Sequence, residues 1–295
     1  MNNLVKKELE RRKYLWEELI KNGGPKNVEA SLLRRIGFFS GQRGIYRAIN
    51  YTRGLTESGE GVTLSVLHTG KHYEDDLTET EIIYHYPQTK RGGHDKNEIE
   101  ATKNAGRLGL PIFVIIGQNN ARDVKIGQVE DWDDKTKTFL ITFIDSIYDS
   151  VPVSEIKSLY ETSEFVPIAK TELISTSVKA RTGQQKFKFH VIKRYGLQCA
   201  VCDINIPQLL QAAHIIPKKD NGSDDPRNGI VLCANHHIAF DLGLFSINPD
   251  NYALIFKDGV NKQALNISKD NLNHLQYKPH LDALKWRWRK FNSLK

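Results

Sequence analysis

Three short segments decide how the C-terminal half folds: Cys199-Ala-Val-Cys202, Ala212-Ala-His-Ile-Ile-Pro217 and Asn228-Gly-Ile-Val-Leu-Cys-Ala-Asn-His-His-Ile-Ala-Phe-Asp241. They contain all three cysteines of the chain. Two residue pairs have the short separation that closes a small loop at one edge of a tetrahedral zinc ion. We therefore expect a structural zinc site with the ligands Cys199, Cys202, Cys233 and His236. The competing interpretation, buried free thiols beside a surface histidine, must treat this spacing as coincidence.

A second set of polar residues lies among these segments: His214, Asn228, His237 and Asp241. Residues 234–242 are predicted to form a helix, so His237 and Asp241 share one helical face and can bind a single cation. His214 ends a predicted strand, residues 210–216, and would point into the same space. Each residue alone is better explained as a structural group, but the whole set favours a second metal site that performs chemistry.

The pattern A-H-I-x-P, followed by N-G-I-x-L-C-x-x-H-H-x-x-F-D, resembles the ββα-metal or HNH nuclease fold over residues 179–247. The resemblance implies that His214 is the general base for the water that attacks the scissile phosphorus. It also implies that His237 and Asp241 hold a catalytic Mg²⁺ or Mn²⁺ ion, while Asn228 braces the loop that orients the base. Ala213 is a departure, because many HNH enzymes have a further metal-binding Asp or His there. Such an ion would take more of its ligands from water or phosphate, which suits Mg²⁺.

The N-terminal half is rich in short β-type runs: residues 61–67, 81–86, 111–116 and 138–143. One helix is predicted between them, at residues 97–108, and an amphipathic helix at residues 3–22 opens the chain. A meander of this kind with a single helix favours a small, curved or barrel-like sheet.

Within this half, residues 69–76, 83–87 and 91–95 place aromatic rings and carboxylates on neighbouring turns. A base taken out of a duplex needs aromatic faces for stacking and a polar group for its Watson–Crick edge. The three segments therefore predict a base-binding pocket. The alternative is that the tyrosines are half-buried strand residues and that the acidic pair forms a turn.

The same segments resemble the SET- and RING-associated (SRA) domain, whose Gly-Tyr-Glu-Asp-Asp run helps to form a pocket for a flipped modified cytosine. The resemblance implies that Tyr73 and Tyr86 stack on the base and that Asp76 faces the cytosine edge. This chain departs from the family pattern with His72 in place of glycine and with Pro87 after the second ring. The expected fold class is thus α+β: an SRA/PUA-like curved β-barrel domain followed by a zinc-stabilised ββα-metal domain.

Charge is distributed unevenly along the chain. Residues 176–295 carry 18 Lys and Arg against 9 Asp and Glu, whereas the remainder carries 24 against 26. A basic half suits nucleic acid, because Lys and Arg displace counterions from the phosphate backbone. Candidate DNA contacts are Arg43, Arg47, Arg181 and Lys186, although a basic turn and a solvated helix explain them equally well.

The chain is long enough for two cores, and we expect a helix at 1–30, a reader domain at 31–150, a linker at 151–178 and a nuclease domain at 179–295. Three cysteines in ligand spacing argue against a disulfide scaffold and for a reducing compartment. The absence of a long apolar run or signal region argues for a soluble protein without a membrane partner.

Together these features predict a modification-dependent, type IV-like restriction endonuclease of the prokaryotic cytoplasm. It would hydrolyse double-stranded DNA near a flipped 5-methyl or 5-hydroxymethyl cytosine. Cutting both strands needs two active sites, so a homodimer is expected. Two alternatives stay open: an HNH nuclease that reads an unmodified sequence or structure, and a non-cleaving protein that binds modified DNA.

Overall fold

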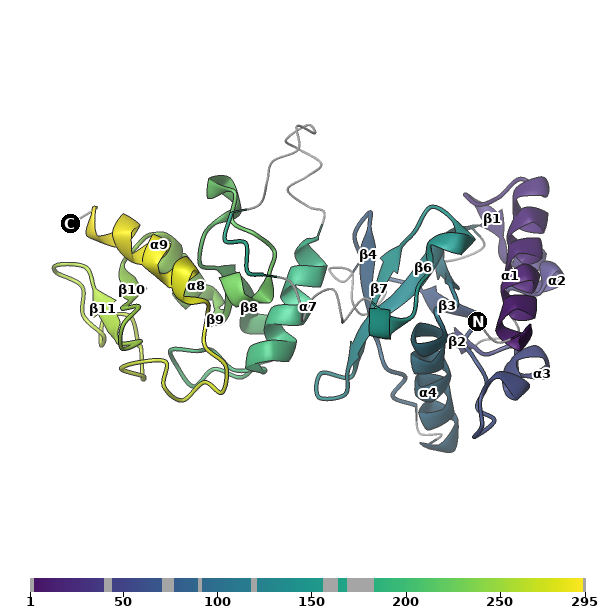
Figure 1. Ribbon diagram of the computed structural model, residues 1–295, viewed down its shortest axis with the longest axis horizontal. Coiled ribbons are helices and arrows are strands. Elements are labelled where there is room, and N and C mark those ends of the chain that lie inside the picture. The colour runs from purple at the N-terminus through teal and green to yellow at the C-terminus, as the bar shows by residue number, and fades with distance from the viewer. Residues whose placement is uncertain are drawn as a thin grey trace. The chain divides into compact units, whose positions relative to one another are not determined.

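The computed structural model describes residues 3–39, 44–70, 77–89, 92–117, 121–155, 164–168 and 183–293. The chain divides into two compact units, Met1–Ser163 and Glu164–Lys295, which are distinguished by colour in Figure 1. Each unit has its own hydrophobic core. The four-part division expected from the sequence stays a prediction.

The N-terminal unit combines a mixed sheet with helices. Its strands are β1 (Val28–Glu29), β2 (Ile45–Tyr46), β3 (Ser65–His68), β4 (Glu81–His85), β5 (Ile112–Ile116), β6 (Ala121–Asp133) and β7 (Thr138–Phe143). Its helices are α1 (Asn3–Lys21), α2 (Ala30–Ile36), α3 (Ile49–Thr52) and α4 (Gly92–Leu108), with 3-10 turns at Arg53–Leu55 and Ile147–Asp149. The opening helix and the helix before β5 confirm two predictions from hydrophobic periodicity.

The sheet has the strand order β2-β3-β5-β6-β7-β4, and β1 pairs with β6 beside this path. Among the strands that the structure describes in this sheet, only the pair β3 and β5 is parallel. The path ends at β2 and β4, so the sheet is open in the part of the chain that the structure describes. A mixed α+β fold is therefore confirmed, whereas the expected SRA/PUA-like barrel is not shown.

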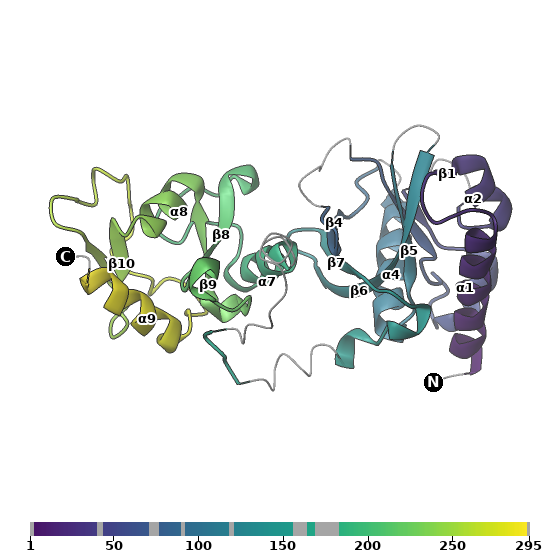
Figure 2. The ribbon, with the colours of Figure 1, turned by 90° about the horizontal axis from the view of Figure 1, so that it is seen from above.

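Helices cover both faces of this sheet. Successive residues of β5 point to opposite faces, and each face packs in its own hydrophobic cluster with a helix. Ile112 and Val114 pack in the same cluster as Ala105 of α4. Phe113 and Ile115 point the other way and join the cluster that contains Leu19 of α1. Figure 2 shows β5 between these two helices.

A buried ion pair attaches α1 to the sheet. Arg12 is completely buried; its Nε donates to Glu8 Oε1 at 2.9 Å, and its Nη1 donates to the carbonyl of Pro111. Glu8 is 4% exposed. The charged residues of the amphipathic opening helix are therefore not all solvated, and this pair sits in the core.

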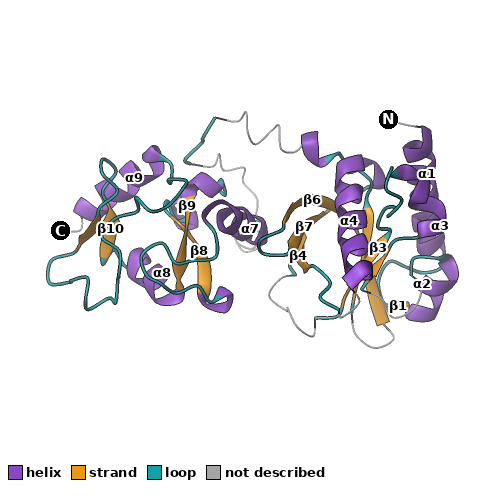
Figure 3. Cartoon of the chain, turned by 90° about the horizontal axis from the view of Figure 1, so that it is seen from below, coloured by secondary structure: helices purple, strands orange, loops and turns teal. Residues whose placement is uncertain are grey.

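The C-terminal unit is built around a two-stranded hairpin. Its elements are α7 (Gln184–Tyr195), β8 (Leu210–His214), β9 (Gly229–Cys233), α8 (Ala234–Asp241), β10 (Phe245–Ile247), β11 (Leu254–Phe256) and α9 (Leu281–Asn292), with 3-10 turns at Pro207–Leu209, Lys218–Asp220 and Pro226–Asn228. Strands β8 and β9 are antiparallel, with Leu210 opposite Cys233 and His214 opposite Gly229. Figure 3 shows the hairpin with α7 and α8 beside it. The ββα order predicted from the sequence is confirmed.

None of the helices that the structure describes is both long and apolar enough to cross a membrane.

Candidate active site and metal centre

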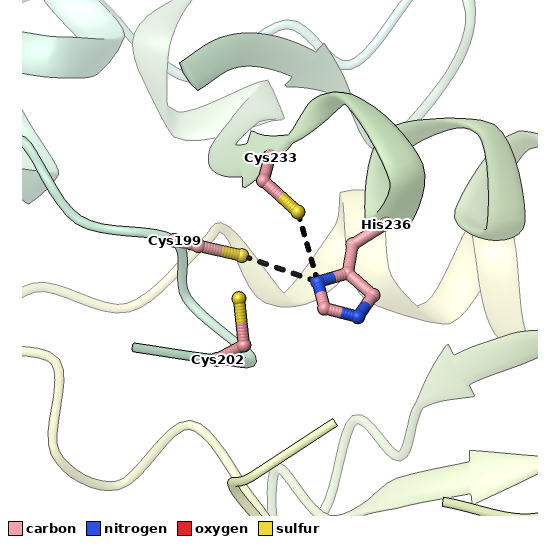
Figure 4. A group of neighbouring side chains, drawn as sticks. All are labelled: Cys199, Cys202, Cys233 and His236. Carbon is pink, nitrogen blue, oxygen red and sulfur yellow. Dashed lines mark hydrogen bonds between the residues drawn. The ribbon is translucent and has the colours of Figure 1, made fainter. Parts of the chain in front are cut away.

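The three cysteines and His236 converge on one point. Their ligand atoms all lie within 4.8 Å of one another, and all four residues are buried. His236 Nδ1 lies 3.1 Å from Cys233 Sγ and 3.5 Å from Cys199 Sγ, as Figure 4 shows. The strand β9 ends at Cys233 and α8 begins directly after it, so one pair comes from this junction and the other from the loop before β8.

The hydrogen bond of His236 to a carbonyl leaves the ring nitrogen that faces the sulfur atoms free to bind a metal. Its Nε2 lies 2.8 Å from the carbonyl oxygen of Leu265, which can only accept a hydrogen bond. Nε2 therefore carries the hydrogen, and Nδ1 keeps its lone pair toward the sulfur atoms. This second contact is the kind that orients metal-bound histidines.

The chemistry of this donor set fits zinc. Three sulfurs and one imidazole nitrogen make a closed tetrahedral set of the structural type. In the chain without metal, burial and, to a smaller extent, the neighbouring cysteines raise the pKa of the Cys202 thiol to about 12. A dication would reverse this penalty, because zinc binds the thiolate form.

His214 lies at the end of β8, and two residues contact its ring. Its Nε2 lies 2.9 Å from Asp224 Oδ1. The other carboxylate oxygen of Asp224 accepts a hydrogen bond of 2.7 Å from Lys218 Nζ. One face of the imidazole stacks on the ring of Phe187 in α7. The base predicted from the sequence is thus held in a defined orientation.

Asn228 holds the loop that follows His214. Its side chain is fully buried, and its Oδ1 accepts from the backbone nitrogen of Ile216 at 2.9 Å. Its Nδ2 donates to the carbonyls of Ile216 at 3.1 Å and Ser223 at 2.9 Å. These bonds close the loop from both ends and support the bracing role predicted for this residue.

His237 and Asp241 lie on one face of α8, as the helical spacing predicts. His237 Nδ1 lies 2.7 Å from Gln211 Oε1 in β8, an oxygen that only accepts, so Nδ1 donates the hydrogen bond. In the neutral imidazole, Nε2 then has a lone pair directed toward Asp241 Oδ2, which is 3.4 Å away. Two acceptors facing each other need a cation between them, either a proton or a metal ion.

The neutral form of His237 is favoured in the folded chain. Burial lowers the pKa of His237, the carboxylate of Asp241 opposes this, and the charges of His214 and Arg287 lower the pKa further. Arg287 comes from α9, where its guanidinium stacks on the ring of Phe240 at 4.1 Å and donates to the Phe240 carbonyl.

Ala213 supplies no ligand to this second site. It is fully buried in the core of the unit. Among the described residues, the cluster of three cysteines and His236 is the one group in which three or more metal-binding side chains converge. A catalytic ion would therefore have two protein ligands, with oxygen from water or substrate completing its shell.

The residues predicted to read a base are only partly described. Tyr73, Asp76, Arg43 and Arg181 lie outside the described residues. Tyr86 is described, and its ring is 6% exposed and packs on Phe139 with centroids 4.4 Å apart. Its hydroxyl donates to Asp134 Oδ1 at 2.9 Å, and burial followed by this bond raises its pKa. The role of Tyr86 as a stacking ring stays a prediction; in this structure the ring packs on Phe139 and the hydroxyl is bonded to Asp134.

The remaining candidate DNA contacts are half-buried. Arg47 donates from Nη1 to the carbonyl of Glu60 at 3.0 Å, which ties it to its own loop. Lys186 lies in the first turn of α7. Their role in DNA binding stays a prediction.

Sequence patterns missed four residues that shape the site: Asp224, Phe187, Gln211 and Arg287. Asp224 is part of an Asp-Asp-Pro turn, and Phe187 is one apolar residue on a helix. No local pattern marks Asp224 and Phe187 as neighbours of His214. They reach it only when the loop before β9 and the helix α7 pack against β8.

Comparison with known proteins assigns this region. Residues 199–248 match the HNH endonuclease family, so the cluster of three cysteines and His236, together with Asn228, His214 and the His237–Asp241 pair, lies within an HNH endonuclease domain. The chain is also similar to the solved modification-dependent TagI restriction endonuclease, with 18% identity, a TM-score of 0.35 and coverage of 90% of this chain and 92% of that one. A second similar structure is the type IV phosphorothioation-dependent restriction endonuclease ScoMcrA, with 13% identity, a TM-score of 0.26 and coverage of 90% and 60%. Comparison with curated proteins gives no match.

Proposed function

We propose that this protein is a modification-dependent, type IV-like restriction endonuclease that hydrolyses double-stranded DNA near a modified cytosine. One observation carries the nuclease half: the segment that matches the HNH endonuclease family holds an oriented histidine at the end of β8 and a histidine–aspartate pair on one face of α8. The hydrogen bond that His237 Nδ1 donates to Gln211 Oε1 connects α8 directly to β8.

In the proposed reaction, His214 accepts a proton from the water that attacks the scissile phosphorus. Asn228 holds the loop that follows His214, so His214 keeps its position as DNA binds. His237 and Asp241 would hold a Mg²⁺ or Mn²⁺ ion, whose charge when bound stabilises the negative charge that develops on the phosphate and the leaving oxygen. The zinc ligands hold the hairpin and α8 together, so the two catalytic elements keep their spacing.

The reader function rests on the resemblance of residues 69–76 to an SRA pocket. The proposed pocket consists of Tyr73, Asp76 and Tyr86, and Tyr86 would have to leave its contact with Phe139 to stack on a base. Arg43, Arg47, Arg181 and Lys186 are proposed to contact the phosphate backbone. A homodimer would supply two nuclease sites, one for each strand.

The test is cleavage of matched duplexes that carry unmodified, 5-methyl or 5-hydroxymethyl cytosine, in Mg²⁺ or Mn²⁺, with products mapped at nucleotide resolution. We expect cutting of a modified duplex only, and His214→Ala should abolish cutting while DNA binding persists. Equal cutting of all duplexes would exclude modification dependence and favour an HNH nuclease that reads sequence or structure. A wild-type chain that binds modified DNA but never cuts would favour the non-cleaving alternative, for which Ala213 is the suggestive feature.

A further inference from the structure

The carboxylate of Asp224 is shared between the proposed base and a lysine. Oδ1 lies 2.9 Å from His214 Nε2, and Oδ2 lies 2.7 Å from Lys218 Nζ. The side chain of Asp224 is 33% exposed and that of His214 is 17% exposed. The pair is therefore sheltered at the edge of the site and is not a freely solvated surface contact.

A third neighbour limits where this carboxylate can lie. Gly183 precedes α7 with a positive φ of 84°, and a Cβ at this position would lie 3.3 Å from Asp224 Oδ2. The negative charge thus lies near the N-terminal end of a helix, where the helix dipole favours an anion. Lysine on one side and the helix end on the other restrict the carboxylate while it faces His214.

This arrangement determines which nitrogen of His214 can act. Burial alone would raise the pKa of Asp224, but hydrogen bonds from His214 and Lys218 outweigh burial and hold the pKa below its ordinary value. An ionised carboxylate only accepts hydrogen bonds, so His214 Nε2 must carry the hydrogen. Nδ1 then keeps the lone pair. The stacked ring of Phe187 prevents the imidazole from tilting away from this arrangement.

We propose that Asp224 is the positioning residue of the general base: it holds His214 in the Nε2–H form, leaves Nδ1 to take the proton from water, and stabilises the imidazolium that results. This inference rests on the proposed nuclease function and adds a residue and an atom to it. Asp224 acts through His214 and does not itself reach the reacting atoms. Proton balance is simple, because one proton moves from water to Nδ1 while the Nε2 hydrogen stays in its bond to Asp224.

The test compares wild type with Asp224→Asn, Asp224→Glu and the control Asp270→Asn in the full-length protein. Asp270 also pairs with a lysine, Lys262, but its side chain is 80% exposed. Two quantities are measured: the single-turnover cleavage rate with DNA affinity, and the ¹⁵N shifts of the His214 ring, assigned by their loss in His214→Gln. Because an amide can donate to Nε2 and so favour the other tautomer, Asp224→Asn should lower the rate about 10²–10⁴-fold.

In the same variant, DNA affinity should stay within about threefold and the ring shifts should show less of the Nε2–H form. Asp224→Glu should recover part of the rate, and Asp270→Asn should match wild type in both readouts. A wild-type rate in Asp224→Asn would overturn the inference, as would a lost rate with an unchanged tautomer. If the wild-type protein cuts no duplex, the proposed function is wrong, and the catalytic role inferred for Asp224 is wrong with it. The ¹⁵N shifts then still show whether Asp224 holds the His214 ring in the Nε2–H form.

Discussion

The ring of Phe187 lies flat against the imidazole of His214, with centroids 3.6 Å apart and planes inclined by 9°. Gly229, which pairs with His214 across the hairpin, makes room for this contact. A Cβ at position 229 would lie 2.9 Å from Phe187 Cζ and 2.4 Å from Val191 Cγ2. The missing side chain in β9 thus lets α7 press an aromatic ring onto the proposed base.

Replacing Gly229 with alanine should therefore disturb both stability and catalysis. The new methyl group would overlap two buried side chains of α7, and overpacking of this kind costs about 1–3 kcal/mol. Denaturant unfolding and the single-turnover cleavage rate would measure the two effects. Gly54→Ala is the control, because no atom lies within 4 Å of its added Cβ and its φ is not in the left-handed region. A Gly229→Ala protein with unchanged stability and rate would contradict this prediction, because it would show that α7 can move to admit the methyl group without losing free energy of unfolding.

Alanine substitutions of the adjacent residues His236 and His237 should remove different properties of the protein. His236→Ala should release zinc and unfold the C-terminal unit, because this imidazole is one of four ligands that hold the hairpin and α8 together. His237→Ala should keep one zinc ion per chain and lose cleavage. Metal content by mass spectrometry and hydrogen exchange of α8 and β9 separate these outcomes. Equal zinc loss in both variants would contradict the assignment.

Glu8→Gln should destabilise the N-terminal unit. The substitution leaves the guanidinium of Arg12 buried without its counter-charge, and breaking a buried ion pair in this way costs about 3–5 kcal/mol. Hydrogen exchange of α1 and β5 would locate the loss in this unit. The matched control is Glu17→Gln, whose side chain is 61% exposed and pairs with Lys13 at 3.8 Å. A loss no larger than that of the control would show that solvent reaches Arg12.

Asp224 should make stability depend on pH in a defined direction. Its pKa in the folded chain lies below the ordinary value of 3.8, so the unfolded chain takes up the proton first as pH falls. The carboxylate thus contributes stability above about pH 4, and this contribution disappears as pH falls through the folded pKa. The stability difference between wild type and Asp224→Asn should be present at about pH 5 and should narrow as pH falls below about 4. A difference that grows as pH falls from about 5 to about 3 would contradict the sign, and Asp270→Asn controls for removal of a surface carboxylate.

Short-range patterns were enough to predict several elements of the fold. Residues 138–143 form β7 with the predicted bounds, and the ββα order of the C-terminal unit follows the predicted strands and helix. The sequence pattern does not predict β6, although at 13 residues it is the longest strand among the described residues. Its charged residues conceal the strand pattern, because Glu130, Asp131 and Asp133 are buried in the folded unit.

Short spacings in the sequence are enough to predict the Cys199/Cys202 pair, the Cys233/His236 pair and the His237–Asp241 pair, because a loop or helical turn of a few residues leaves two side chains little freedom to lie apart. Only packing brings the two cysteine-containing pairs together, places Asp224 and Phe187 against His214, and buries Tyr86 in a core. The physical reason is distance along the chain. Such contacts form only when separate elements pack, and which partners meet then depends on space, such as the room that Gly229 leaves for a ring.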